Sequence, residues 1–136
     1  MGDTILGQGG NDTNCTSGSD YFWDGGGGDL FTLSATFPLS GDFRYINGKT
    51  SVETLDTRAV SVNRLVNLET GLDSRPDAPI MPAEEFHNFE NLVTGGGNDF
   101  PVSSDLLNEI DSNGDNDSVD GRAGSDAIFG GAIMTS

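Results

Sequence analysis

The sequence predicts an all-β fold built from copies of one short unit, and three observations carry this prediction. Acidic or amide side chains recur every nine residues near the C-terminus, at Asp99, Asn108, Asp117 and Asp126. Glycines cluster ahead of Asp99 and Asp126, and an apolar residue follows two residues after most of the four positions, as Ile110 and Val119 do. A fixed short period is typical of a structural unit that is stacked on its own copies.

The same unit is present at the N-terminus. Asp3 and Asp12 are nine residues apart, and so are Asp20 and Asp29, with a slip of one residue between the two pairs. Four glycines lead directly into Asp29, and Phe31 follows it two residues later. Glycine accepts the positive φ angles of tight turns. Each unit therefore predicts a glycine-rich turn, an acidic residue and a very short strand.

Composition divides the chain into two such flanks and a different middle. Residues 1–30 contain 9 glycines and no Lys or Arg, and residues 90–136 contain 8 glycines and one Arg. Residues 31–89 contain only 3 glycines but five of the six basic side chains. We therefore expect an N-terminal repeat block over residues 1–32, an irregular β-rich insertion over residues 33–85, and a truncated C-terminal repeat block over residues 86–136.

The first half of the middle contains a candidate turn. Asn47 and Gly48 suit a two-residue hairpin between residues 43–46 and 49–52. An ordinary bend between strands of the repeat is the alternative. In either case we expect the strands of the middle to be longer than those of the flanks.

The second half of the middle mixes strand and loop signals. Residues 60–62 alternate between apolar and polar as a strand does. Three prolines predict a loop over residues 73–82. Residues 83–86 follow the last of these prolines and allow one short helical turn, the longest helix that this stretch predicts.

The charge of the chain excludes two classes of partner. It carries 22 acidic against 6 basic side chains, a formal net charge of −16 at pH 7. Nucleic acids and anionic membrane surfaces are bound largely through Lys and Arg, so we expect neither as a partner. No apolar run approaches the roughly 20 residues that span a bilayer, and the N-terminus lacks the pattern of a signal peptide.

A chain this small, acidic and rich in glycine needs a staple in order to fold. Cys15 is the only cysteine, which excludes an internal disulfide framework and makes a metal the natural candidate. Calcium takes six to eight oxygen ligands at about 2.3 to 2.6 Å from carboxylates and backbone carbonyls. A glycine-rich turn can direct its carbonyls inward, and the following Asp adds charge and further oxygens. One turn alone offers too few ligands.

The units closely resemble the calcium-binding nonapeptide G-G-x-G-x-D-x-U-x of haemolysin-type (RTX) proteins. The resemblance covers residues 1–32 and about 86–132, and residues 89–93 resemble the degenerate unit that opens such a block. It implies a right-handed parallel β-roll, a solenoid in which two units form one coil. It further implies a secreted protein that type I secretion machinery exports unfolded and that folds on calcium outside the cell.

The resemblance also implies the ligands, because turns eighteen residues apart share one ion. The expected pairs are Asp99 with Asp117, Asn108 with Asp126, Asp3 with Asp20, and Asp12 with Asp29. The full set of expected calcium ligands, through carboxylate, amide or backbone oxygens, is Asp3, Gly7, Gly9, Asp12, Asp20, Gly25, Gly27, Asp29, Gly95, Gly97, Asp99, Asn108, Asp117, Gly121, Ala123 and Asp126.

We expect no enzymatic activity. His87 is the only histidine, and no zinc or catalytic-triad pattern surrounds it. Cys15 stands at a strand position, which favours a small packed side chain over a catalytic thiol. Residues 111–117 begin like an EF-hand loop, but Asn116 stands in place of the glycine that the motif needs and Arg122 in place of its bidentate glutamate.

Two other interpretations of the chain remain open. One is a non-catalytic fragment of a larger RTX toxin or hydrolase, since Met1 stands inside a repeat unit. The other is an adhesin-like module whose middle binds a glycan or a protein. Because Phe22 takes the apolar position of its unit, its neighbours Tyr21 and Trp23 point outward. An exposed cluster of Tyr21, Trp23, Arg44 and Tyr45 would favour this second function.

Overall fold

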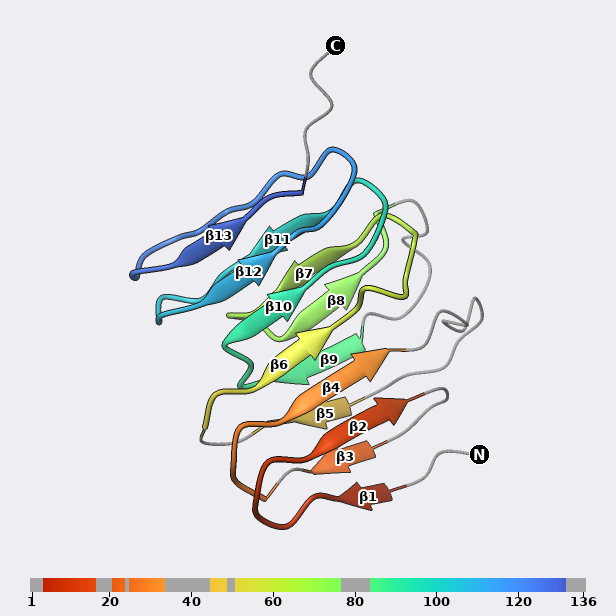
Figure 1. Cartoon of the computed structure of the whole chain (residues 1–136), viewed down its shortest axis with the longest axis vertical. Coiled ribbons are helices and arrows are strands. Elements are labelled where there is room, and N and C mark those ends of the chain that lie inside the picture. The colour runs from red at the N-terminus through yellow and green to blue at the C-terminus, as the bar shows by residue number, and fades with distance from the viewer. Residues whose placement is uncertain are drawn as a thin grey trace.

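The structure is a computed structural model that describes residues 4–16, 21–23, 25–33, 45–48, 51–76 and 84–131 (Figure 1). Within these residues the predicted all-β class is confirmed, with thirteen short strands and no helix. The strands are β1 (Thr4–Leu6), β2 (Thr13–Thr16), β3 (Tyr21–Trp23), β4 (Leu30–Leu33), β5 (Tyr45–Asn47), β6 (Thr54–Asp56), β7 (Leu65–Asn67), β8 (Leu72–Ser74), β9 (Glu84–His87), β10 (Asn91–Val93), β11 (Phe100–Val102), β12 (Glu109–Asp111) and β13 (Ala127–Phe129).

The strands form two sheets, and for most of its length the chain changes sheet after every strand. Sheet A has seven strands in the order β1-β3-β5-β9-β8-β7-β11, and sheet B has six in the order β13-β12-β10-β6-β4-β2. Figure 1 shows the strands of both sheets following one another along the long axis of the molecule, with β1 and β13 at opposite ends. In the described part of the chain, no helix is long and apolar enough to cross a membrane.

The register of sheet B follows the repeat. Its strands are all parallel to their neighbours, and Asn91, Glu109 and Ala127 stand side by side in β10, β12 and β13. Coils in this block are offset by 18 residues, which is two nine-residue units. In the N-terminal block Thr13 pairs with Leu30, and the offset there is 17 residues. The one-residue slip in the sequence thus corresponds to a coil that is one residue shorter than those of the C-terminal block.

The middle segment interrupts this path inside sheet A. After β6 the chain runs forward in β7, back in β8 and forward again in β9, so that β8 is antiparallel to both neighbours. Strand β9 then pairs with β5, and β11 pairs with β7, both in parallel. The meander of β7, β8 and β9 is therefore part of sheet A, and parallel stacking continues on both sides of it.

The core lies between the sheets and is formed by the central residues of the strands. Phe22, Phe31, Leu55, Leu92 and Ile110 are each at most 1% exposed. They belong to one cluster to which all three predicted segments contribute. Burying such a side chain is worth about 1.5 to 3 kcal/mol. Each of these residues stands two positions after an acidic or amide residue, which is the apolar position of the predicted unit.

The turn at Asn47 and Gly48 is a bend and not a hairpin. Strand β5 pairs in parallel with β3 and β9, and the next described strand, β6, lies in the other sheet. Ile46 is fully buried between the sheets. This burial holds β5 in sheet A, so the local turn preference of Asn-Gly does not decide the pairing.

Other expectations for the middle are wrong. Residues 60–62 lie in the turn between β6 and β7, where buried Val60 donates its amide to the Thr57 carbonyl at 2.9 Å. Residues 84–86 belong to β9 and form no helical turn, because buried Phe86 pairs with Ile46.

The predicted loop over residues 73–82 begins as strand, since Asp73 and Ser74 belong to β8. Residues 77–82 lie outside the described part. The strands of the middle are three or four residues long, as in the flanks, so the expected greater length is also wrong. Tertiary pairing across the two sheets outweighs the local signals at these positions.

Candidate metal sites in the stacked turns

In sheet B, the residue directly before each strand takes an equivalent place in successive coils. Along sheet B these residues form column B, which consists of Asp12, Asp29, Glu53, Glu90, Asn108 and Asp126. Along sheet A the corresponding column A contains Arg64 before β7 and Asp99 before β11. Its third member is Asp117, because Asp120 forms an isolated parallel bridge with Val102 of β11, a register that sets Asp117 beside Asp99. The expected ligands Asp3 and Asp20 lie outside the described residues.

In column A, Asp99 lies between Arg64 and Asp117. Its Oδ1 accepts a hydrogen bond from the Arg64 amide at 2.8 Å, and its own amide donates to Oδ1 of Asp117 at 2.9 Å. Asp99 is 3% exposed, and its Oδ2 is buried without a hydrogen-bond partner among the described residues. Burial raises the pKa of the Asp99 carboxyl and outweighs the hydrogen bonds from the Arg64 amide and the Thr94 side chain, which lower it; the charge of Asp117 acts in the same direction as burial.

In column B, Asp29 has the equivalent environment. It is 2% exposed, its Oδ1 accepts a hydrogen bond from the Asp12 amide at 2.5 Å, and its Oδ2 is buried with no partner in the described part of the chain. The turns ahead of these two residues touch through their backbones. Gly27 has a φ of +131°, and a Cβ there would lie 2.2 Å from the Gly10 carbonyl oxygen. Only glycine allows this stacking.

A similar contact stacks the turn ahead of Asp99. A Cβ on Gly95 would lie 1.9 Å from the Val60 carbonyl oxygen, and one on Gly97 would lie 3.0 Å from the Asn63 amide. Beside it, the Asn98 amide donates to Oδ1 of Asn63 at 2.8 Å. The expected ligands Gly95 and Gly97 are therefore part of a turn that packs on its neighbour, as Gly25 and Gly27 do in the N-terminal block.

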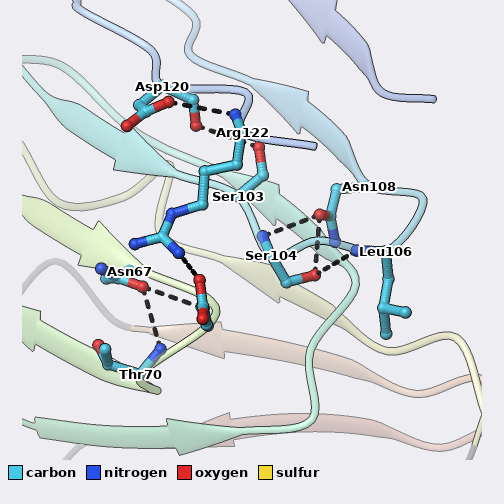
Figure 2. Close-up of polar contacts among 9 residues, drawn as sticks. Asn67, Thr70, Ser103, Ser104, Leu106, Asn108, Asp120 and Arg122 are labelled. Atoms are coloured by element: carbon cyan, nitrogen blue, oxygen red, sulfur yellow. Dashed lines mark hydrogen bonds and ion pairs between the residues drawn. The ribbon is translucent and has the colours of Figure 1, made fainter. Parts of the chain in front are cut away.

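Asn108 has other partners. Its Oδ1 accepts hydrogen bonds from the amide and the hydroxyl of Ser104, both at 3.0 Å, as Figure 2 shows. Its Nδ2 donates to the Glu90 carbonyl at 2.8 Å, and its amide donates to Oδ1 of Asp126 at 3.0 Å. Both polar atoms of the Asn108 side chain thus have partners within the chain itself, and we leave this residue out of the proposed ligands.

The last turn is tied to the meander. Arg122, with a φ of 46°, stands between the expected carbonyl donors Gly121 and Ala123. Its guanidinium forms an ion pair with Glu69 in the turn between β7 and β8, and its amide donates to Oδ1 of Asp120 at 3.1 Å (Figure 2). Both members of the ion pair are partly exposed, so the pair contributes little to stability.

Sequence reasoning missed two members of the columns. Glu53 is fully buried before β6, and Arg64 is 1% exposed before β7. Neither is an Asp, and neither follows a run of glycines. The signal that identifies them is the apolar residue two positions later, Leu55 or Val66, which is buried in both cases.

The environments of Asp29 and Asp99 fit a hard cation. Each combines a buried carboxylate oxygen with stacked turns whose carbonyls are oxygen donors, and neither offers the sulfur or imidazole ligands that zinc prefers. No three His, Cys, Asp or Glu side chains cluster in the described ranges, so an ion there would take most of its ligands from the backbone. Comparisons with protein-family models, curated proteins and solved structures found no match.

Proposed function

We propose that this chain is a calcium-binding module of the RTX type, a right-handed parallel β-roll that belongs to a secreted protein. The ions are held between stacked glycine turns, and their binding drives folding. We propose no catalytic role, because the acidic residues that the sequence singles out serve to hold ions.

One observation carries this proposal. Asp29 and Asp99 each bury a carboxylate with one oxygen lacking a hydrogen-bond partner among the described residues. An ionised carboxylate in that state is costly, and buried charges in proteins are normally paired or coordinate a metal. Both residues stand at the acidic position of the nonapeptide, in turns that stack on a neighbouring turn.

Calcium would neutralise the stacked carboxylates and join two coils through shared oxygen ligands. Column B would offer Asp12 and Asp29 with the turns that precede them, and column A would offer Asp99 and Asp117 with theirs. The protein's part is to hold these oxygens on adjacent coils, which the amide bonds to Oδ1 of Asp29 and Asp117 support. The remaining carboxylate oxygens can then turn to the ion.

The same arrangement supports a role in export. Without the ion, carboxylates on successive coils repel one another, and the short strands bury few apolar groups, so the repeats would stay unfolded where calcium is scarce. An unfolded chain suits passage through type I secretion machinery. Outside the cell, several weak sites would act together, each adding about 0.4 to 1.4 kcal/mol at millimolar calcium if its Kd is about 10⁻⁴ to 10⁻³ M.

Calcium titration by isothermal calorimetry tests this function. In Asp29→Asn and Asp99→Asn each substitution removes one charge at a proposed site, so we expect each variant to lose a site or to bind there at least about tenfold more weakly. Asp105→Asn is the matched control, because Asp105 is exposed and lies outside both columns. Equal binding by all three variants and the wild type would refute the assignment.

A further inference from the structure

The outer faces of the two sheets differ in chemistry. On sheet A the outward side chains of β3 are Tyr21 and Trp23, which are 47% and 42% exposed, and Tyr45 follows on β5. On sheet B, the outward positions of the next strand of the chain, β4, are Leu30 and Thr32. Aromatic side chains therefore gather on one face only in this part of the molecule.

The rings form a continuous row across three adjacent parallel strands. The ring centroids of Trp23 and Tyr45 are 5.4 Å apart with an interplanar angle of 41°, and those of Tyr45 and His87 are 5.3 Å apart at 43°. These separations are close to the spacing of neighbouring strands, about 4.7 to 4.9 Å. We call these three rings, together with the exposed Tyr21 that pairs with Tyr45 in the strand register, the aromatic platform.

Polar groups border the platform and fix its orientation. Asn47 donates from Nδ2 to the Tyr45 hydroxyl oxygen at 3.3 Å, and Asn88 donates from Nδ2 to Oδ1 of Asn47 at 2.8 Å. Nε2 of His87 lies 3.3 Å from Oε2 of Glu85. Because the Tyr45 oxygen accepts from Asn47, its own O–H can be donated to a ligand. The platform is thus apolar on its face and rich in donors and acceptors at its edge.

We propose that the aromatic platform binds a neutral polysaccharide. A sugar ring presents apolar C–H groups on its faces and hydroxyls around its edge, which match aromatic rings bordered by Asn47, Glu85 and Asn88. The row of rings suits a linear chain of sugars, one ring after another. The net charge of −16 disfavours anionic glycans, so the ligand is uncharged.

The size of the platform argues against a folded protein as the occupant. An aromatic side chain buries about 150 to 250 Å² when fully covered. Less than half of each platform residue is exposed to solvent. The four residues together therefore present an accessible surface of about 400 Å² or less. A stable protein interface needs about 800 Å² on each partner. A single glycan strand needs far less.

Intrinsic fluorescence gives a direct test, because Trp23 is the only tryptophan. The wild-type chain in excess calcium is titrated with soluble xylan, a neutral glucan and, as the charged counterpart, hyaluronan, which calcium does not gel. We expect a neutral glycan to shift the Trp23 emission and hyaluronan to leave it unchanged. In Tyr45→Ala the apparent Kd should rise about tenfold or more, and in Tyr45→Phe, which keeps the ring, it should rise less.

Phe129→Ala is the matched control, because Phe129 is 53% exposed on the terminal strand of sheet B, away from the platform. It should bind as the wild type does, and circular dichroism in calcium should show each variant folded. The proposal is overturned by the absence of any response to neutral glycans, by a response to hyaluronan alone, or by equal weakening in Tyr45→Ala and Phe129→Ala. Sedimentation showing a dimer that Tyr45→Ala dissociates would make a second copy the occupant and overturn it as well.

Discussion

The column position before β7, in the middle, and those before β4 and β11, in the flanks, carry opposite charges. Before β7 the column position is taken by Arg64, whose Nε donates to Oδ1 of Asp73 at 2.9 Å, with both residues buried. Before β4 and β11 it is taken by Asp29 and Asp99, each with a buried oxygen that has no partner in the described ranges. Before β7 the chain supplies its own cation, and before β4 and β11 we propose that a bound ion takes this role.

The largest effect should come from removing the internal cation. Arg64→Met leaves Asp73 buried and without its cation, and breaking a buried ion pair in this way costs about 3 to 5 kcal/mol. Urea unfolding in excess calcium measures the loss, which added calcium should not restore. In the flanks, by contrast, the external ion should dominate stability.

The double variant Arg64→Met with Asp73→Leu is the control. It replaces both charges by apolar side chains of similar size, so most of the lost stability should return. A loss below about 1 kcal/mol in the single variant would show that the middle does not depend on its internal pair.

A smaller effect is expected from the stacked turns of the flank. Gly27→Ala forces a side chain into a φ of +131° and against the Gly10 carbonyl. This should lower the free energy of unfolding by about 1 to 3 kcal/mol. Gly114→Ala is matched in chemistry, but no atom lies within 4 Å of its added Cβ and its φ is not positive. Thermal unfolding in calcium should separate the two variants, and equal melting temperatures would contradict the stacking.

The smallest effect concerns a second ion pair of the middle. Burial acts to raise the pKa of Asp56, but hydrogen bonds and charge from Arg58 outweigh it and lower the pKa below its ordinary 3.8. The carboxylate therefore stabilises the fold above pH 3.8 and loses this contribution as the pH falls through the lower folded value. The stability difference between wild type and Asp56→Asn should shrink over that range and also shrink in high salt, since Arg58 is largely exposed. A constant difference would contradict the pairing.

The regular part of the fold could be predicted from sequence because its signals are local. An acid followed two residues later by a buried apolar side chain marks the start of a strand at Asp29 with Phe31 and at Glu90 with Leu92. The nine-residue period then gives the neighbours of each coil, and the structure does bring Asp99 and Asp117 onto adjacent coils.

The meander could not be predicted because its pairing is not local. Phe86 pairs with Ile46 across 40 residues, and both side chains are buried, so the core makes residues 84–87 a strand despite a local helix signal. Val60 and Val62 alternate as in a strand, yet they lie in a turn whose apolar side chains pack on the core. In both cases packing decides between conformations that the local sequence leaves open.

The candidate site was predictable in position but not in chemistry. At the acidic position Asn108 looks equivalent to Asp99, but an amide can donate as well as accept. Only the structure shows the Glu90 carbonyl that receives the donor of Asn108. Likewise Arg64 breaks the acidic pattern, and its partner Asp73 becomes visible only once β8 lies beside β7.

The dependence of folding on calcium is tested most directly by far-ultraviolet circular dichroism of the wild-type chain, titrated with calcium from excess chelator. The account predicts a weak β signal in chelator and a cooperative gain of β signal as calcium is added, with magnesium producing little change. If the chain shows the same β signal and the same urea midpoint in chelator as in calcium, the stacked carboxylates do not need an ion, and the account is contradicted.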